Sequence, residues 1–400
     1  MRLMYYDDSI FDNVGKVDIR KRIRTFAKDY LTEVFSEVDI VINGDRPWDI
    51  QVKDERFYGC VLSSGSLGFG ESYMMGWWDC AALDQAIFNI LRHKLDQHFC
   101  KKIPDTLRKL KFRLFNYQDK RHAFKIGEHH YDAGNDLFIL MLDPYMAYSC
   151  GYWLEANNLN EAQEAKLELI CRKLGLKPGM KLLDIGCGWG SLVWYAARHF
   201  GVEAVGLTVS EEQAKIAKER CASLPVEIRL QDYRDISGSF DAIASVGMFE
   251  HVGYKNYKTF MNVVDSSLRE DGLFLLHTIG SNKTTLSCDP WFDKYIFPNG
   301  MLPSISQISK ATEPHFIMED WQNLNVDYEK TVLSWYGNFE NSWDKIKHKY
   351  GEKFRRMWRY YLLSCAGGFR ARYIQVWQIV LSPKGAVNGY KSVRCHSCYS

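Results

Sequence analysis

The chain has 400 residues, more than one hydrophobic core usually requires, so two packed units are expected, although one large α/β domain would also fit. A formal net charge of +2 and a pI near 7.9 show no positive excess, so no nucleic-acid partner is expected. No apolar run reaches the roughly 18 residues of a membrane-spanning helix, and the opening MRLMYYDDSI lacks a signal-peptide pattern, which predicts a cytoplasmic protein.

Residues 1–105 are interpreted as a small α+β domain. DIVINGDRPWDIQVKD (39–54) predicts short strands around an Asp-Arg-Pro turn, and GSLGFGESYMMGWWDC (65–80) predicts a glycine-rich turn that enters an aromatic segment. The pair Trp77–Trp78 suits either insertion at a membrane interface or packing against the rest of the chain. A linker rich in Lys and Arg is expected at 106–125.

Residues 126–390 show apolar runs alternating with helical patterns, which predicts a parallel sheet with helices on both faces. The expected buried strands are MKLLDIG, VEAVGLTV, VEIRLQD, FDAIASVG and GLFLLHTIG. Asn160 followed by Gln163, and Ser210 followed by Gln213, match capping boxes and predict two helix starts.

The eleven cysteines are irregularly spaced, which suits free thiols in a reducing compartment better than a disulfide framework. A tail is expected at 391–400, and its CHSC is one CxxC without a second pair. We therefore expect no metal site and a tail without fixed structure.

A glycine turn follows the strand that ends at Ile185. Gly186, Gly188 and Gly190 would let the backbone turn tightly and let a ligand approach closely. The spacing is GxGxG rather than GxGxxG, and the next strand lacks the acid that grips an NAD ribose, which disfavours a dehydrogenase. An acid two residues ahead, Asp184, is typical of Rossmann-like methyltransferases that bind S-adenosylmethionine, where it can offset the positive methionine end.

Two alternatives stay open at this level. The glycines can serve only the strand-to-helix turn. Asp232, after the third strand, stands where such folds contact adenine, but a strand-end cap is an equally ordinary role for it.

Several long blocks stand in chain order: HYDAGNDLFILMLDPYMAYSCGYW, LLDIGCGWG, SVGMFEHVG, LLHTIG, YIFPNG and CAGGFRARYIQVWQ. Through them the chain resembles the family of bacterial cyclopropane fatty acid synthases and mycolic acid cyclopropane synthases. The resemblance covers nearly the whole chain up to about Lys384. It implies a class I S-adenosylmethionine-dependent methyltransferase domain behind a small lipid-associated N-terminal domain.

The family's reaction adds a methylene group to the cis double bond of unsaturated phospholipid acyl chains. The alkene attacks the sulfonium methyl, a carbocation develops, and a base removes a methyl proton to close the ring, which requires positioning, dry walls and a proton acceptor. By resemblance a bound bicarbonate ion is that base. It would be held by the side chains of Glu250, His277 and Tyr328 and by backbone groups at Cys150 and Ile279.

Taken singly, these residues have ordinary interpretations. His277 in an apolar strand suits a satisfied core histidine, and Glu250 suits the opening of a helix. Cys150 could be a nucleophile, but direct methyl transfer requires no covalent intermediate, so its backbone is favoured as the contributor. Cys365 is another family cysteine, and packing near the cavity is favoured over a chemical role for it.

For the cofactor, the resemblance carries over a set of positions along the sheet edge: Tyr148, Ser149, Asp184, Gly186, Gly188, Gly190, Thr208, Ser210, Gln213, Gln231 and Asp232. Gln213 has two competing roles, because a side chain committed to the cap of the following helix is not free to contact a ribose.

A bilayer with unsaturated chains is the expected partner, with the protein docked peripherally on the inner face of the cytoplasmic membrane. Residues 341–400 carry twelve Lys/Arg against two Asp/Glu, a surplus that suits anionic headgroups. Apolar residues recur there at helical spacing, either facing a core or lining an acyl channel: Trp343, Ile346, Tyr350, Phe354, Met357 and Tyr361. The resemblance also implies a homodimer.

Three other functions compete with this one. A relative that forms methyl-branched, methylene-branched or hydroxylated chains would share the carbocation and differ in what quenches it. A lipid-binding module without catalysis would lack S-adenosylmethionine binding. A nicotinamide oxidoreductase would bind NAD(P)H, which the glycine spacing disfavours.

Overall fold

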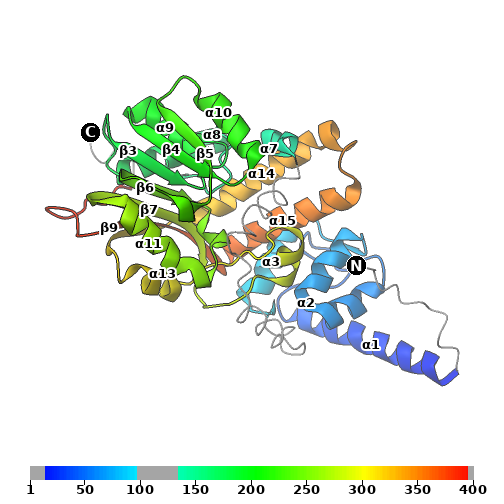
Figure 1. Ribbon diagram of the computed structural model, residues 1–400. Helices are drawn as coiled ribbons and strands as arrows, with labels where there is room; N and C mark the ends of the chain where they lie inside the picture. The colour runs from blue at the N-terminus through cyan, green and yellow to red at the C-terminus, as the bar shows by residue number, and fades with distance from the viewer. Residues whose placement is uncertain (1–13, 97–133, 395–400) are drawn as a thin grey trace.

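A computed structural model describes residues 14–96 and 134–394, and its centre is a seven-stranded sheet (Figure 1). The strands lie in the order β5-β4-β3-β6-β7-β9-β8, and β9 is antiparallel to both of its neighbours, whereas β3 to β7 pair in parallel. Their bounds are β3 Lys181–Ile185, β4 Glu203–Thr208, β5 Val226–Leu230, β6 Phe240–Val246, β7 Leu268–Ser281, β8 Ile317–Asn323 and β9 Ile374–Ser382. The expected α/β architecture and its five parallel strands are confirmed.

Helices cover both faces of this sheet (Figure 1). One face packs against α8 (Leu159–Lys173), α9 (Ser191–Phe200) and α10 (Glu211–Cys221), and the other against α11 (Tyr257–Ser267) and α13 (Ile305–Thr312). Neighbouring strand residues point to opposite faces, so Leu182 joins the first layer and Leu183 the second. Both faces are therefore buried, which explains the continuous apolar runs of the strand sequences.

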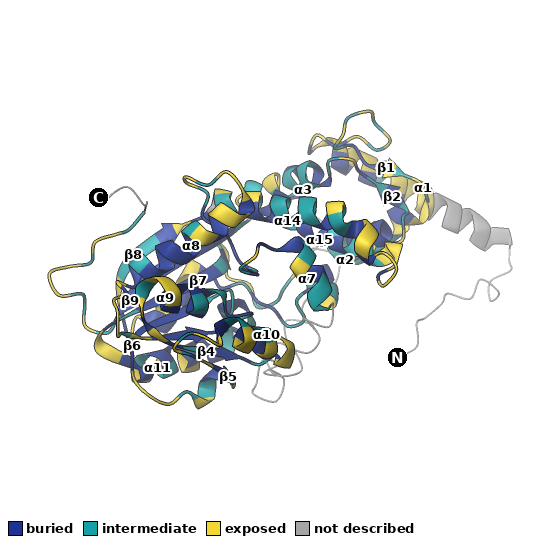
Figure 2. Ribbon diagram, turned by 90° about the horizontal axis from the view of Figure 1, so that it is seen from above, coloured by how far each residue is buried: buried dark blue, intermediate teal, exposed yellow. Residues whose placement is uncertain are grey.

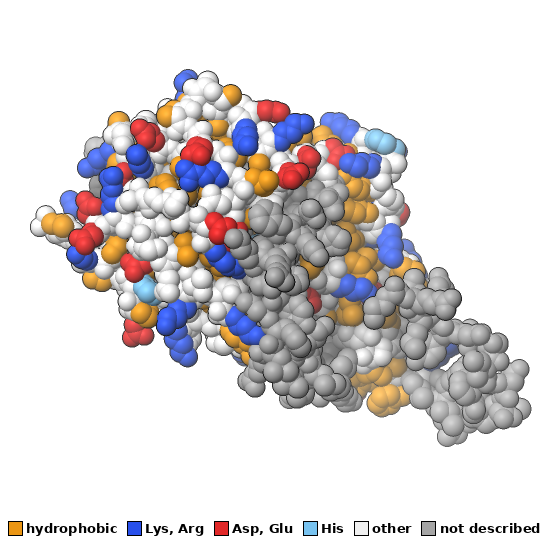
Figure 3. All heavy atoms as spheres, in the orientation of Figure 1, with side chains coloured by type: hydrophobic (Ala, Val, Ile, Leu, Met, Phe, Trp, Pro, Cys, Tyr) orange, Lys and Arg blue, Asp and Glu red, His pale blue; other side chains and the backbone are white. Residues whose placement is uncertain are grey.

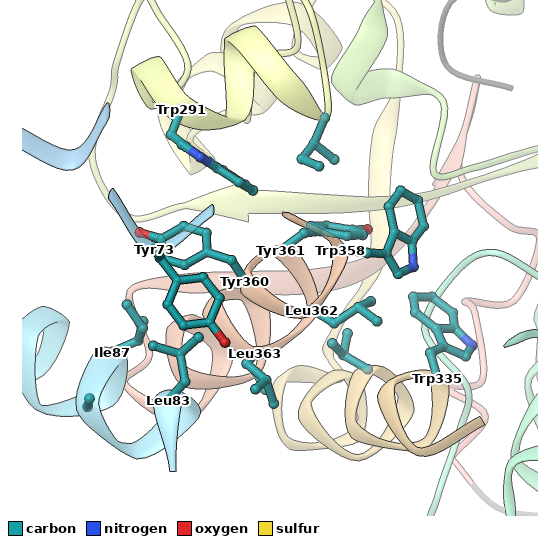
Figure 4. Close-up of a cluster of buried hydrophobic side chains, with 14 of the residues drawn as sticks. Tyr73, Leu83, Ile87, Trp291, Trp335, Trp358, Tyr360, Tyr361, Leu362 and Leu363 are labelled. Carbon is teal, nitrogen blue, oxygen red and sulfur yellow. The ribbon is translucent and has the colours of Figure 1, made fainter. Parts of the chain in front are cut away.

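A helical layer joins this sheet domain to the N-terminal residues. It comprises α1 (Val14–Ser36), α2 (Arg56–Met74), α3 (Leu83–Arg92), α7 (Asn135–Met141), α12 (Pro290–Tyr295), α14 (Asn325–Ile346) and α15 (Glu352–Arg370). Figure 4 shows how side chains of α15 meet Tyr73 of α2, Leu83 of α3 and Trp291 of α12 in one buried cluster. Figure 2 shows α2, α3, α14 and α15 grouped together, each with dark blue buried residues among intermediate and exposed ones.

The shared core affects the expected division of the chain into two domains. One hydrophobic cluster contains residues from both sides of the segment 97–133, so the N-terminal helices and α15 share a core. The linker expected at 106–125 lies outside the described residues, and the proposed domain boundaries stay predictions.

The glycine-rich stretch 65–80 forms the expected turn only at its first residue, because residues 65–74 belong to α2 and the remaining glycines of that part are helical. Gly65 has φ 56° and kinks the helix. A Cβ at Gly68 would overlap the carbonyl of Cys60, and one at Gly70 would overlap the ring of Trp291. These two glycines allow close packing within a helical hairpin and against α12, a role that the sequence pattern alone does not distinguish from a turn.

The N-terminal region is also poorer in strands than predicted. β1 (Gln51–Val52) and β2 (Trp78–Asp79) contain two residues each and pair with one another. Trp78 is fully buried, and its indole N–H donates to the Phe69 carbonyl and to Ser72 Oγ, whereas Trp77 is half-buried beneath the guanidinium of Arg56. Trp78 is therefore a core residue and not a membrane anchor.

One of the two predicted helix starts differs in the structure. The cap of α8 is Asn158 rather than Asn160, because Asn158 accepts the Glu161 N–H, while Gln163 turns inward and donates to the carbonyls of Ala147 and Ser149. Ser210 caps α10 as predicted. The apolar stripe from 343 to 361 is divided between α14 and α15, with Gly351 as the cap between them, and it mostly faces the core.

The residues expected to form a tail are docked as far as the description extends. Ser392 and Arg394 both hydrogen-bond to Asp320 of β8, and the Tyr390 hydroxyl donates to the Lys173 carbonyl. The prediction of a tail without fixed structure is therefore wrong for 391–394, because a buried carboxylate captures the arginine. CHSC lies outside the described residues.

The contact between α3 and α15 gives a test of this packing. A Cβ at Gly367 would lie 2.5 Å from the Asp84 carbonyl oxygen, so we expect Gly367→Ala to lower the free energy of unfolding by about 1–3 kcal/mol. Gly337 of α14 has open space at its Cβ position, and Gly337→Ala should be neutral or stabilise by up to about 1 kcal/mol. Urea unfolding of both variants measures the difference, and equal stabilities would contradict the close packing.

Candidate active site

A cavity of about 280 Å³ opens at the carboxyl edge of β3, β4, β5 and β6, where parallel sheets usually bind ligands. α14 and α15 close its far side through Tyr328 and Tyr361. Most of the predicted site residues line it: Tyr148, Ser149, Asp184, Gly186, Gly188, Thr208, Ser210, Gln213, Gln231, Asp232, Glu250, Ile279, Tyr328 and Cys365. Cys150, Gly190 and His277 are not part of the lining.

The glycine turn forms one wall of the cavity. Gly186 has φ 89°, and a Cβ there would lie 2.7 Å from the Cβ of Met248, so both backbone conformation and space require glycine. Gly190 caps α9 in the left-handed region, and a Cβ there would lie 3.1 Å from that of Ala217 in α10. The first glycine therefore shapes the ligand-facing surface, whereas the third serves the packing of two helices.

Gln213 belongs to α10 and contacts the end of β4. Its side chain does not have the role that the capping pattern predicts. Its side-chain oxygen accepts a hydrogen bond from the Thr208 hydroxyl at 2.8 Å, while Ser210 Oγ accepts the Gln213 backbone N–H at 3.3 Å. Only the serine half of the capping box is thus formed. Helix capping and ligand binding therefore do not compete for the Gln213 side chain, because Thr208 holds its amide toward the cavity.

Asp232 has the strand-end cap role that the sequence allowed, and the adenine contact stays a prediction. Its carboxylate caps the short turn Tyr233–Asp235 by accepting the Arg234 N–H at 2.9 Å, and it pairs with the Arg234 guanidinium at 3.1 Å. Asp232 also lines the cavity next to Gln231. The strand-end cap therefore holds the carboxylate in place at the cavity wall.

Glu250 is a buried acid in the turn Phe249–His251 that follows β6. One carboxylate oxygen, Oε1, accepts the Ile279 N–H at 2.6 Å, and the other, Oε2, is buried without a hydrogen-bond partner. Burial raises the pKa of Glu250 to about 7, partly opposed by the Ile279 hydrogen bond. An incompletely paired acid with a pKa near neutrality is a common feature of catalytic sites.

His277 lies on β7, two residues before Ile279. The amide nitrogen of Gln378 lies 3.3 Å from its Nδ1, and its Nε2 is buried without a partner. Burial, followed by the charges of Lys166 and Lys173, lowers the pKa of His277 to about 3, so the ring is neutral at physiological pH. With the Gln378 amide donating to Nδ1, the ring proton is on Nε2, which is then a donor awaiting an acceptor.

Neither predicted cysteine has the environment of a nucleophile. The Cys150 thiol is fully buried, contacts the carbonyls of Gly151 and Leu324, and has a pKa raised well above its usual value by burial. Cys365 lines the cavity from α15, and burial raises the pKa of its thiol to about 12. Because the thiolate is the reactive form, both side chains are protonated and inert at neutral pH.

Aromatic rings form the wall that faces the sheet edge. Tyr328 stacks on Phe369 with ring centroids 4.5 Å apart and meets Trp335 edge-on, and the hydroxyls of Tyr148 and Tyr361 are hydrogen-bonded at 2.7 Å. Sequence reasoning did not single out Trp335 or Phe369. Phe369 follows Cys365 by four residues, so helical spacing from a known lining position was a usable signal.

A buried lysine was also missed. Lys166 of α8 lines the cavity, is 2% exposed, and donates to Ser149 Oγ at 3.0 Å. Asp184, also 2% exposed, lines the same cavity from β3, and burial raises its pKa to about 7. Lys166 lies three residues after the inward-turned Gln163, so a charged residue on the buried face of α8 was the signal.

The cations expected to meet a membrane are largely paired within the protein. Seven of the twelve Lys/Arg in 341–400 form ion pairs with carboxylates: Lys347, Lys349, Arg355, Arg356, Arg370, Lys384 and Arg394. On the face in Figure 3, blue and red side chains are interspersed. Among the described residues, no helix has both the length and the apolarity needed to cross a bilayer.

Comparison with known proteins places these features in a family. The family model described as mycolic acid cyclopropane synthetase matches residues 118–379. Cyclopropane-fatty-acyl-phospholipid synthase of Escherichia coli (strain K12) is 55% identical over 362 residues, 90% of this chain and 94% of that protein. A probable fatty acid methyltransferase of Pseudomonas putida is 38% identical over 275 residues, 66% of this chain and 70% of that protein.

A solved structure of mycolic acid cyclopropane synthase CmaA1, complexed with SAH and CTAB, superposes with a TM-score of 0.60 at 34% identity. The superposition covers 64% of this chain and 97% of that chain. The two chains are therefore similar in sequence as well as in fold. The superposed part of this chain is about as long as the part that the family model matches.

The buried acid at the site should affect stability in a pH-dependent way. The pKa of Glu250 is raised on folding, so its contribution to stability is present below about pH 4.5 and is lost as the pH rises through about 7. Glu250→Gln removes this loss and should stabilise the protein by about 3 kcal/mol at pH 8, with a gain that shrinks towards pH 4.5. Urea unfolding at pH 5 and pH 8 measures it.

Glu219→Gln is the matched control, because Glu219 is exposed on α10. It should change stability by less than about 0.5 kcal/mol at both pH values. The quantity to compare is the stability difference between Glu250→Gln and the unsubstituted chain. If this difference is the same at both pH values, Glu250 is not held in a low-dielectric environment.

Proposed function

Because the chain belongs to the mycolic acid cyclopropane synthetase family, we propose that it transfers a methylene group from S-adenosylmethionine to cis double bonds of unsaturated phospholipid acyl chains, forming cyclopropane fatty acids. The observation that carries the proposal is one cavity that joins a glycine turn, a buried incompletely paired acid and an aromatic wall. The first suits a nucleotide, the second a proton transfer, and the third an apolar chain with a developing positive charge.

The residues present fit S-adenosylmethionine. Gly186 and Gly188 leave room for close approach, Thr208 holds the Gln213 amide toward the cavity, and Asp184 presents a buried oxygen, Oδ1, without a hydrogen-bond partner. When bound, S-adenosylmethionine would supply the methyl group that becomes the ring carbon. The SAH complex of CmaA1 supports this assignment, because SAH is the product that methyl transfer leaves.

The aromatic wall would hold the reacting part of the acyl chain. The rings of Tyr328, Trp335 and Phe369 exclude water, and their π faces attract a positive charge without offering a nucleophile that would trap it. The apolar side chain of Cys365 and the hydrogen-bonded pair of Tyr148 and Tyr361 complete an environment in which a carbocation survives long enough to lose a proton.

Two orphaned polar atoms fit a bound bicarbonate ion. Glu250 Oε2 and His277 Nε2 are both buried without a partner, and Tyr328 is close enough to Glu250 for its hydroxyl pKa to be raised by that carboxylate. When bound, bicarbonate would supply the base that accepts the methyl proton. His277 would donate to it, and Glu250 would share a proton with it, which is possible whether that proton starts on the ion or on the acid.

The substrate implies a membrane surface. We propose that the protein docks peripherally on the inner face of the cytoplasmic membrane and works as a homodimer, as the family resemblance implies. Because most cations of 341–400 are internally paired, docking would depend on other surfaces. Cosedimentation with vesicles of anionic phospholipid and sedimentation velocity of the purified chain test these two proposals.

A second candidate is a fatty-acid methyltransferase that leaves a methyl-branched, methylene-branched or hydroxylated chain. The match to the Pseudomonas putida protein, named a probable fatty acid methyltransferase, favours keeping it. It differs from the first candidate only in how the carbocation is quenched, since a hydride shift followed by proton loss would give a methyl- or methylene-branched alkene, and water addition with proton loss would give a hydroxylated chain.

Product analysis decides between them. Purified protein incubated with S-adenosylmethionine and vesicles of cis-unsaturated phospholipid should give fatty-acid methyl esters one CH₂ heavier, without a double bond, by gas chromatography and mass spectrometry. A branched or hydroxylated ester would favour the second candidate. Absence of any product, with the cofactor bound, would exclude both for this lipid.

The role of Glu250 is tested separately. Glu250→Gln should bind S-adenosylmethionine as the unsubstituted chain does and lower turnover by at least about 100-fold, because proton transfer is mispositioned. Turnover of the unsubstituted chain should fall in carbonate-depleted buffer and recover with added bicarbonate, whereas the variant should not recover. Full activity of Glu250→Gln, with Glu219→Gln as the control, would remove Glu250 from the mechanism.

A further inference from the structure

The cavity contains two opposite buried charges that do not pair with each other. Lys166 projects from α8 and Asp184 from the end of β3, and both line the cavity. Each charge is close enough to shift the pKa of the other, yet no ion pair within 4.0 Å joins them. A buried acid and a buried base held apart leave room for a ligand that carries both opposite charges.

The contacts of these two side chains are incomplete. Lys166 Nζ has three N–H groups, and its hydrogen bond within the protein is to Ser149 Oγ at 3.0 Å. Asp184 Oδ1 is buried without a partner. Asp143, the other acid near Lys166, is already engaged with the backbone N–H groups of Tyr145 and Ala147. Buried charges without partners are costly, so such sites are usually completed by a ligand.

We propose that Lys166 binds the carboxylate of the methionine end of S-adenosylmethionine, with Ser149 beside it, next to the α-ammonium group that the resemblance already assigns to Asp184. The inference rests on the proposed function, since it assigns a further contact in the same site. Among common cofactors, a zwitterionic amino-acid end presents both charges on adjacent carbons, which matches one cation and one anion on two sides of a cavity.

The electrostatics of the two side chains are consistent with this assignment. Burial lowers the pKa of Lys166 to about 8 and raises that of Asp184 to about 7, so neither group is fully charged near neutral pH. A carboxylate beside the lysine and an ammonium beside the aspartate would each stabilise the charged form of its neighbour. The ligand therefore gains two charge-assisted hydrogen bonds where water is excluded.

A purely structural role for Lys166 makes a different prediction. In that case the lysine only ties the segment containing Ser149 to α8, and its removal would weaken every ligand of the cavity equally. A direct contact would instead depend on the ligand's carboxylate. The two roles are separated by ligands that differ in that one group.

The test is isothermal titration of the full-length protein with S-adenosylhomocysteine and with its decarboxylated analogue. Lys166→Met should weaken S-adenosylhomocysteine by about 10- to 100-fold, the usual loss for a hydrogen bond between charged groups, and leave the analogue within about threefold. Lys173→Met is the matched control, because Lys173 is the other fully buried lysine of α8 and does not line the cavity. It should leave both affinities unchanged.

Equal losses for the two ligands, or no loss for either, would overturn the proposal. If Lys166→Met does not fold, the unsubstituted chain still decides, because it must bind S-adenosylhomocysteine at least about tenfold more tightly than the analogue. Similar affinities would overturn the carboxylate contact. Failure of the unsubstituted chain to bind S-adenosylhomocysteine at all would instead contradict the proposed function, and the two failures are thus distinguishable.

Discussion

The site depends on the placement of one helix, α15, which has two different faces. Tyr361, Cys365 and Phe369 face the cavity, whereas Gly367 lies against the backbone of α3 and Arg356 donates to the carbonyls of Tyr73 and Trp78. A glycine contact cannot slide without a clash, and the half-buried Arg356 cannot leave its acceptors without losing several hydrogen bonds. The N-terminal helices therefore hold the aromatic wall at a fixed distance from the sheet, which links a region without site residues to the geometry of the reaction.

Although the helices around the cavity are closely packed, the buried titratable groups inside it are electrostatically unfavourable to folding. Glu250, Asp184 and Lys166 all have pKa values shifted toward their neutral forms, and His277 is held neutral with an unpaired nitrogen. A core of apolar residues in the same positions would be more stable. Their presence is explained by what they do when ligands complete their hydrogen bonds, and the close packing around α15 supplies the stability that the cavity lacks.

Features that depend on neighbouring residues were predictable from the sequence, whereas features that depend on residues far apart in the chain were not. The five parallel strands and the glycine turn after Ile185 were predictable because apolar periodicity and turn chemistry are local. Gly70 was misread because the reason for glycine there is the Trp291 ring, more than two hundred residues away, and Gly68 because glycine there allows contact with the Cys60 carbonyl, a packing reason that resembles a turn in the sequence. Apart from the glycine turn, Asp184 and Asp232, the site residues were predicted through the family resemblance rather than through chemistry. Lys166 was missed although it is a charge on a buried helix face.

The cavity wall combines buried charged groups with aromatic rings, and this combination explains how one site can serve a charged cofactor and an apolar chain. Asp184 comes from β3 just before the glycine turn and Lys166 from α8, whereas the stacked rings of Tyr328 and Phe369 come from α14 and α15. The acid–base groups connect the two sets electrostatically, because Glu250 raises the pKa of Tyr328 while Lys166 lowers that of His277. A methyl group carried on a sulfonium would pass from the charged cofactor to the apolar chain as it is transferred. The proton acceptor is thus needed near the transferred methyl group. Glu250 lines the cavity and has an unpaired Oε2, and His277, outside the lining on β7, has an unpaired Nε2.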